Sequence, residues 1–71
     1  MEEIKVSNNI RKLRFFSDEM SQQQLADLVG CSRQTIVTLE QDKYSPSLLL
    51  AAKIARVFKV KIEDVFTIEF L

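Results

Sequence analysis

The sequence contains no histidine, and only one cysteine, one proline and one glycine occur among its 71 residues. A lone cysteine, Cys31, cannot form an intramolecular disulfide, and without histidine it cannot complete a zinc site. The scarcity of glycine and proline disfavours an all-β sandwich, which needs many turns. We therefore expect a helical fold that holds no metal and no cofactor.

The chain also lacks the groups on which most enzymes depend. It has no histidine, no cluster of metal ligands, no glycine-rich phosphate loop and no convincing nucleophile. We therefore expect neither an enzymatic activity nor a small-molecule ligand.

Long apolar runs are absent as well. None approaches the roughly 20 residues that span a bilayer, and the acidic start, Met1-Glu2-Glu3, differs from the basic start and apolar core of a signal peptide. These features predict a cytoplasmic protein without a membrane partner.

No excess of charge favours a nucleic-acid partner, because ten basic residues balance ten acidic ones. Any DNA binding must then rest on a local patch, on helix N-termini and on contacts doubled by a dimer. The hydrophobic fraction of 46% and the charged fraction of 28% are those of a globular protein. We expect one domain over residues 1–71, small enough to gain stability by oligomerising.

Serine caps mark the starts of two successive helices. Ser21 and Gln24 have the spacing of a capping box, and Met20 and Leu25 have that of a hydrophobic staple. Leu25, Ala26, Leu28 and Val29 are then expected on the buried face. Gly30 suits the left-handed position that follows a helix.

The next helix is expected from Ser32, its N-cap, to about Gln41, with Ile36 and Leu39 buried. Cys31 and Ile36 have the spacing of its staple, which favours a small buried hydrophobe over a redox sensor for Cys31. Two helices joined by a short turn containing glycine form a helix-turn-helix.

Three further helices and two strands complete the prediction. Residues 10–16 form a helix capped by Ser7, Asn8 or Asn9, Ser47 caps another that ends at about Phe58, and residues 62–65 make one helical turn. Residues 3–6 and 67–71 alternate as strands do and are predicted to pair as an antiparallel ribbon.

Ordered motifs along residues 8 to 66 resemble the Cro/Xre-type helix-turn-helix regulators. The resemblance is carried by SQQQLADLVG at 21–30, CSRQTI at 31–36, LEQDKYSPSL at 39–48, and IEDVF at 62–66. It implies a five-helix, lambda-repressor-like DNA-binding domain, and the two termini add the small β-ribbon. In such domains the third helix enters the major groove, and small members often bind palindromic operators as homodimers.

The resemblance directs attention to the third helix as the reader of bases. Arginine can hold guanine and glutamine can hold adenine through two hydrogen bonds, and small apolar groups can touch a thymine methyl. The candidate base-reading residues are Ser32, Arg33, Gln34, Val37 and Thr38. Without the family pattern, the same residues are an ordinary solvated helix face.

Phosphate contacts are expected at the start of the second helix and in the loop after the third, because free backbone N–H groups and Lys or amide side chains suit phosphate. The candidates are Ser21, Gln22, Gln41, Lys43, Tyr44 and Ser45. An ordinary surface role remains the alternative for each. The family also implies a structural ion pair between Arg14 and Glu40, against the alternative of two separate surface charges.

The sequence departs from the family pattern in three places. The interval from Arg14 to Ser21 is one residue longer than usual, so a looser first turn is expected. Asp42 and Lys59 occupy positions where glycine is customary. At Lys59 we expect either a left-handed conformation in a residue other than glycine or a different end of the helix.

Surplus apolar residues predict a contact between copies of the chain. Leu48, Leu49 and Leu50 are consecutive, so at least one of them must leave the core of its helix. The candidate dimer-interface residues are Leu49, Phe66, Ile68, Phe70 and Leu71. The alternative is that the terminal ribbon covers this surface within one chain.

Two functions remain open from the sequence. The first is a transcriptional regulator, a repressor that occupies an operator in double-stranded DNA as a homodimer. The second is a protein-interaction module, an antitoxin or co-regulator, that binds another protein and touches DNA secondarily.

Overall fold

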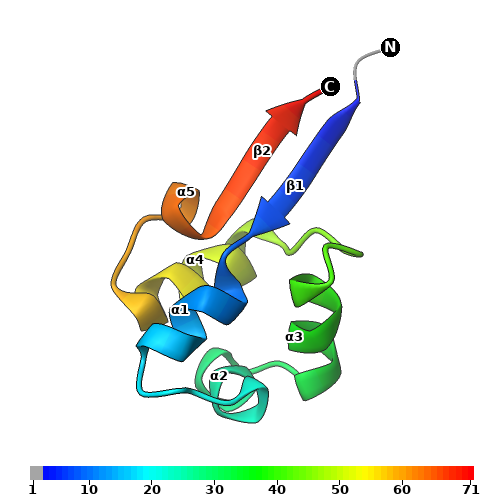
Figure 1. The fold of residues 1–71 in the computed structure, drawn as a ribbon. Helices are drawn as coiled ribbons and strands as arrows, with labels where there is room; N and C mark the ends of the chain where they lie inside the picture. Colours follow the sequence, from blue (N-terminus) through cyan, green and yellow to red (C-terminus); the bar gives the residue numbers. More distant parts are fainter. Residues whose placement is uncertain (1–2) are drawn as a thin grey trace.

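The computed structural model describes residues 3–71, so Met1 and Glu2 of the acidic start lie outside it. Within that span the predicted five helices and two-stranded antiparallel sheet are present. The helices are α1 (Ile10–Phe16), α2 (Gln22–Val29), α3 (Arg33–Glu40), α4 (Leu48–Phe58) and α5 (Ile62–Val65), and the strands are β1 (Ile4–Asn8) and β2 (Phe66–Phe70). Figure 1 shows the helices gathered into one body from which the two strands project side by side.

The predicted caps of α2 are formed. The Ser21 hydroxyl accepts from the Gln24 backbone N–H at 3.0 Å, and the Gln24 side chain accepts from the Ser21 N–H at 2.8 Å. Gly30 ends the helix in the left-handed conformation, at φ 74°. Ser32 and Ser47 cap α3 and α4 in the same way by accepting from backbone N–H groups.

The core lies where the helices meet, and it draws on every helix. Its buried members are Ile10, Leu25, Ala26, Val29, Ile36, Leu39, Ala51, Ile54, Ala55, Val65 and Phe66. The helical spacing of apolar residues within each segment predicts most of this set. In residues 3–71, no helix combines the length and the apolar character needed to cross a membrane.

Leu28 is the exception on α2, because the expected burial of its side chain is wrong. It is 62% exposed, whereas Leu25, Ala26 and Val29 are buried. At about 3.6 residues per turn, Leu28 lies roughly 100° around the helix from the centre of that buried face. It therefore projects beside the core rather than into it.

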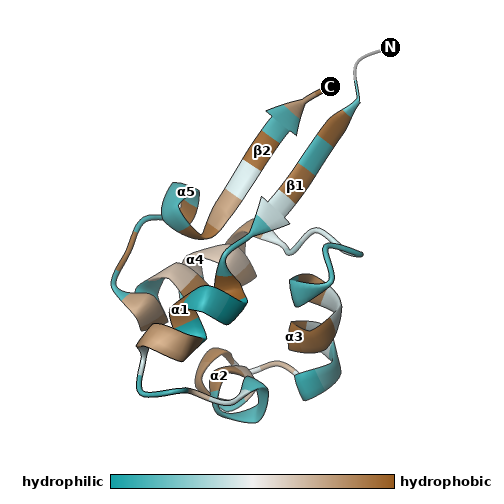
Figure 2. Ribbon diagram, viewed as in Figure 1, coloured by the Kyte–Doolittle hydropathy of each residue, from teal (hydrophilic) through white to brown (hydrophobic). Residues whose placement is uncertain are grey.

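The terminal ribbon, formed by β1 and β2, has one apolar and one polar face. The strands pair in the register Ile4↔Phe70, Lys5↔Glu69, Val6↔Ile68, Ser7↔Thr67 and Asn8↔Phe66. Because directly opposed residues point to the same side, Ile4, Val6, Ile68 and Phe70 share one face. Figure 2 shows the resulting alternation of hydrophobic and hydrophilic residues along both strands.

The ribbon differs from its prediction in its bounds. β1 continues to Asn8 rather than stopping at residue 6, and β2 begins at Phe66 rather than at residue 67. Phe66 is only 8% exposed and belongs to the core. The base of the ribbon is thus packed on the helical body, while its distal part stands clear of it (Figure 1).

Four residues other than glycine have positive φ angles. Asp42 and Lys59 do so at the two positions where the family pattern has glycine, with φ of 58° and 57°. At Lys59 the turn is a Schellman motif, since the Lys59 N–H donates to Arg56 and the Val60 N–H to Ala55. The hydrogen bonds that close this turn require the left-handed conformation despite the lysine side chain.

The extra residue before α2 is accommodated in the same way. Asp18 and Glu19, with φ of 54° and 55°, are both left-handed and widen the turn after α1. The turn is closed where the Met20 N–H donates to the carbonyl of Arg14 at 3.0 Å. The first turn is therefore wider, as expected, but it is hydrogen-bonded.

Replacing Lys59 by glycine should stabilise the protein. A left-handed conformation costs an L-residue about 1–2 kcal/mol, and the greater entropy of unfolded glycine offsets about 0.5–1 kcal/mol of the gain. We expect Lys59→Gly to raise the free energy of unfolding by about 0.5–1 kcal/mol in a denaturant titration. Lys53→Gly, the same change at an exposed position inside α4, is the matched control and should lower the free energy of unfolding by about 1 kcal/mol. A loss of stability in Lys59→Gly equal to that in the control would contradict this account.

Candidate functional site

Two helices joined by a tight turn form the centre of the candidate site. α2 ends at Val29 and α3 begins at Arg33, so three residues link them. The Cys31 N–H donates to the carbonyl of Ala26 at 3.0 Å, which closes the turn. The buried Ile36 and Leu39 hold one side of α3 in the core, so the opposite side faces outward.

The first turn of α3 is exposed to solvent. Ser32, Arg33 and Gln34 are exposed, whereas Val37 and Thr38 are half-buried. Figure 2 shows the hydrophilic start of this helix on the outside of the molecule. Among residues 3–71, the Arg33 side chain has no hydrogen bond or ion pair, so its guanidinium is free to meet a ligand.

The other polar residues of this surface are already ordered by local hydrogen bonds. The Gln34 amide donates to the Thr38 hydroxyl at 3.3 Å, and that hydroxyl donates to the Gln34 carbonyl at 2.8 Å. The Ser32 hydroxyl lies 2.9 Å from the Thr35 hydroxyl. These bonds restrict the side chains while leaving the Gln34 amide oxygen available.

The Glu40 carboxylate connects three helices. Its Oε2 accepts from Arg14 Nε at 2.6 Å, and its Oε1 accepts from Arg14 Nη2 at 3.0 Å. Oε1 also accepts from the Gln22 amide at 3.1 Å. The Arg14 and Glu40 side chains are only 15% and 9% exposed, so this fork-shaped pair is largely shielded from water.

Acidic groups near α3 are all engaged by donors. Besides Glu40, Asp27 accepts from the Gln23 amide at 2.8 Å, and Asp42 accepts from the Asn8 amide at 3.0 Å. Residues 21–45 carry a formal charge of −1, from Arg33 and Lys43 against Asp27, Glu40 and Asp42. Because the pairing neutralises Glu40, the exposed charge of this surface is more positive than the count suggests.

The predicted phosphate contacts divide into exposed and engaged side chains. Gln41, Lys43, Tyr44 and Ser45 are exposed in the loop after α3. Ser21 uses its hydroxyl as a helix cap, and the half-buried Gln22 donates to Glu40. Backbone N–H groups at the start of α2 are thus better placed than the Ser21 hydroxyl for an anion.

Cys31 lies in the turn between α2 and α3, where it is half-buried against the core. Burial raises the pKa of its thiol above the ordinary value, and the nearby Lys53 charge opposes that shift. A raised pKa disfavours the thiolate, which is the reactive form.

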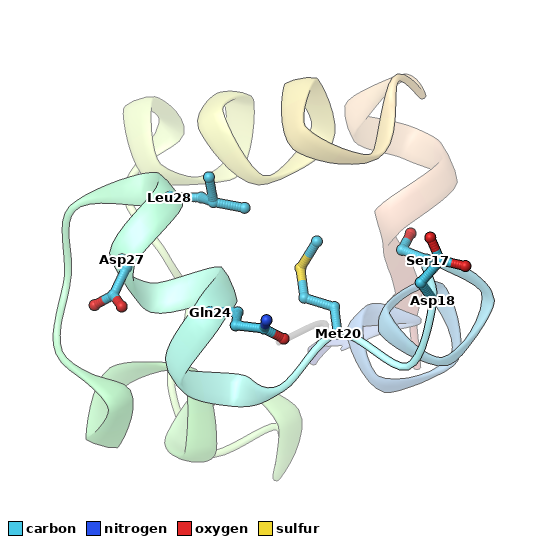
Figure 3. A pocket seen from close by; sticks show the side chains of 6 residues that line it. All are labelled: Ser17, Asp18, Met20, Gln24, Asp27 and Leu28. Carbon is cyan, nitrogen blue, oxygen red and sulfur yellow. The ribbon is translucent and has the colours of Figure 1, made fainter.

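A separate hollow lies beside α2, on the side of the turn that precedes it. Its volume is about 350 Å³, and it is lined by Ser17, Asp18, Met20, Gln24, Asp27 and Leu28. Figure 3 shows Met20, Gln24 and Leu28 pointing into the hollow, with Asp27 turned away. Its charged lining groups are carboxylates, which repel phosphate and nucleic acid. Among residues 3–71, no group of three His, Cys, Asp or Glu side chains is placed to hold a metal ion.

The predicted dimer-interface residues are exposed with one exception. Leu49, Ile68, Phe70 and Leu71 are 60–69% exposed, whereas Phe66 lies in the core. The sequence-based set omitted Ile4, which opposes Phe70 across the ribbon and is also exposed. The ribbon register adds Ile4 to this apolar surface, and burial in the core removes Phe66 from it.

Two features of the site were missed by sequence reasoning. The Gln22 amide lies against Glu40, and the Asn8 amide donates to both Leu39 and Asp42. From the sequence, Asn8 is a candidate helix cap only. These partners are 18 to 34 residues away in the chain, so no local motif reveals them.

Comparisons with known proteins agree with this geometry. The helix-turn-helix family model matches residues 10–65. An HTH-type transcriptional regulator of Archaeoglobus fulgidus is 64% identical over 47 residues, which cover 66% of each chain. One from Methanocaldococcus jannaschii is 50% identical over 82% of this chain and 91% of its own, and YgzD of Bacillus subtilis is 44% identical over 90% and 96%.

Removing one partner of the Arg14–Glu40 pair should destabilise the protein strongly. Glu40→Ala leaves a shielded guanidinium without its carboxylate, and we expect the free energy of unfolding to fall by about 3 kcal/mol. The double variant Arg14→Met with Glu40→Leu removes both charges and should recover much of that loss. Denaturant titrations measure both. Glu69→Ala, an exposed carboxylate on the ribbon, is the control and should change stability by less than about 0.5 kcal/mol. A double variant no more stable than Glu40→Ala would contradict the expected cost of the unpaired guanidinium.

Proposed function

We propose that this chain, which belongs to the Cro/Xre-type helix-turn-helix family, is a sequence-specific DNA-binding transcriptional regulator. It binds a palindromic operator as a homodimer and places α3 in the major groove. It represses transcription by occupying a promoter, and it acts in the cytoplasm.

The single observation that carries this proposal is the free Arg33 side chain at the exposed start of α3. Arg33 and Gln34 are exposed together, and these two residue types recognise guanine and adenine by paired hydrogen bonds. Val37 and Thr38, one turn further along, supply methyl groups for contact with thymine. In helix-turn-helix proteins, the first residues of the motif's second helix, which is α3 in this chain, contact base edges.

Phosphate contacts fix such a helix in the groove. The start of α2 presents backbone N–H groups and the positive end of the helix dipole. The exposed Gln41, Lys43, Tyr44 and Ser45 follow α3 and supply polar contacts on its other side. Two contact regions flanking a reading helix set its depth and direction on the duplex.

A second copy of the chain is the partner that best fits the apolar face of the terminal ribbon. Ile4, Ile68 and Phe70 lie on that face and are 60–69% exposed, and a two-stranded ribbon is marginally stable in water without cover. Twofold pairing of identical apolar faces buries both at once. It also doubles the DNA contacts, which a chain with no net charge requires.

A protein-interaction role is the second candidate. The exposed Leu48 and Leu49 lie at the start of α4, and Phe15 and Phe16 are also 62% and 70% exposed. These side chains suit a heterologous partner, as in an antitoxin or co-regulator. Burial of Leu49, Phe70 and Leu71 against a different protein would favour this function over the homodimer.

Selection of bound sites from random DNA at a stated salt concentration tests the regulator function. We expect two half-sites with centres about one helical turn apart. Arg33→Ala should weaken binding to the selected site by about 1–3 kcal/mol and relax the preference at one base position of each half-site. Arg56→Ala, an exposed arginine on α4, is the control and should leave that preference unchanged. A uniform loss of affinity of Arg33→Ala on all sequences would show that Arg33 does not read bases.

The ribbon-mediated homodimer is tested by two lysine substitutions at adjacent exposed positions. Ile68→Lys places a charge on the apolar face, and Thr67→Lys places the same charge on the polar face. We expect sedimentation analysis to find a dimer for the wild type and Thr67→Lys, and a monomer for Ile68→Lys. Since a monomer cannot bind bivalently, Ile68→Lys should also bind a two-half-site duplex more weakly. Equal assembly of the two variants would contradict the proposed interface.

A further inference from the structure

Asn8, at the end of β1, hydrogen bonds to the end of α3 that lies farthest from Arg33. Its side-chain amide donates to the Leu39 carbonyl at 2.7 Å and to the Asp42 carboxylate at 3.0 Å. We propose that Asn8 is a positioning residue, which couples the terminal ribbon to the DNA-contacting loop of residues 42–45. This inference rests on the proposed DNA-binding function.

The last carbonyls of α3 lack helical partners and accept hydrogen bonds from residues outside the helix. A Schellman motif supplies two bonds, from the Asp42 N–H to Leu39 at 3.0 Å and from the Lys43 N–H to Thr38 at 3.3 Å. The Asn8 amide adds the shortest hydrogen bond to the Leu39 carbonyl. The carbonyl is therefore bonded both from its own helix and from the ribbon.

Asp42 is the second point of attachment. It adopts the left-handed conformation, with φ of 58°, without being a glycine, and this conformation sets the direction in which Lys43 and Tyr44 leave the helix. The hydrogen bond from Asn8 to a carboxylate is charge-assisted and stronger than a neutral one. It holds Asp42 in the conformation that its side chain alone does not favour.

The ribbon in turn fixes Asn8. Asn8 pairs with Phe66 in the strand register, and Phe66 is buried in the core. The side-chain Oδ1 of Asn8 also accepts from the Ile10 N–H at 3.1 Å. Strand pairing therefore fixes the backbone from which the amide reaches α3, so order in the ribbon is transmitted to the loop.

Asn9 provides a matched control at the next position. Its side-chain amide donates to the Asp64 carbonyl at 3.2 Å, in α5, and its backbone N–H donates to Val65. Asn8→Asp and Asn9→Asp each add one negative charge and remove one amide donor group. Only Asn8→Asp removes donors to the end of α3, and it keeps the oxygen that accepts from Ile10.

DNA binding of these two variants tests the proposal on the duplex obtained by site selection. We expect Asn8→Asp to bind about tenfold more weakly than Asn9→Asp. For Asn8→Asp, the slope of log affinity against log salt concentration should be shallower than for the wild type. The difference should be about 0.9 for each phosphate that a subunit no longer neutralises. Lys43→Ala should weaken binding less in the Asn8→Asp background than in the wild type, because both changes act through the same loop.

A double variant that leaves the net charge unchanged keeps the test decisive if Asn8→Asp folds poorly. Asn8→Asp combined with Asp42→Asn reverses donor and acceptor in the bond between residues 8 and 42 and leaves the Leu39 carbonyl without its donor from the ribbon. Asparagine tolerates the left-handed conformation. We expect this double variant to recover part of the affinity and of the salt dependence. Equal affinities of Asn8→Asp and Asn9→Asp, or no recovery in the double variant, would overturn the proposal.

Hydrogen exchange in the free protein separates this inference from the proposed function. The Asp42 and Lys43 amides should exchange several-fold faster in Asn8→Asp than in Asn9→Asp. If the wild type selects no DNA site, the proposed function fails, and faster exchange in Asn8→Asp alone would still support the hold of Asn8 on the loop. Identical exchange in the two variants would refute that hold.

Discussion

The structure depends on the Glu40 carboxylate, at which three helices meet. Glu40 lies in the last turn of α3 and accepts hydrogen bonds from Arg14 of α1 and Gln22 of α2. Apolar packing alone allows a short helix to slide and rotate, because dispersion contacts have little directional preference. A fork-shaped arginine pair has a defined geometry, so it fixes the angle at which α3 presents its outer side.

The same arrangement explains how a chain without net charge can offer a surface to DNA. A free carboxylate at position 40 would repel phosphate beside the helix, but its pairing with Arg14 removes that repulsion. Asp42 is held by Asn8 and Asp27 by Gln23, whereas Arg33 and Lys43 remain exposed. Affinity for DNA then depends more on placed contacts than on a general positive field, and the proposed homodimer would supply each contact twice.

The sequence predicted the local parts of this fold well, since local chemistry determines them. Helix starts are predicted by three serine caps, Ser21, Ser32 and Ser47, each of which accepts from the backbone N–H three residues further on. Alternating apolar and polar residues at the two termini predicted the ribbon. Leu28 was misplaced because its angular position is at the edge of the buried face. The bonds of Asn8 to α3 and of Gln22 to Glu40 could not be predicted, since they depend on tertiary geometry. Phe66 shares a ribbon face with the exposed Ile68 and Phe70, and only its tertiary position, at the base of the ribbon against the helices, makes it a core residue.

The proposed regulator function rests on Arg33 meeting a base edge in the major groove, and this contact is probed by replacing single guanines of the selected operator with 7-deazaguanine. This base lacks the N7 acceptor that arginine uses together with O6. If Arg33 reads a guanine, one such replacement per half-site will weaken binding of the wild type but leave the affinity of Arg33→Ala unchanged. If no guanine shows this dependence on Arg33, or if both proteins lose affinity equally at every position, Arg33 does not read a guanine in the groove.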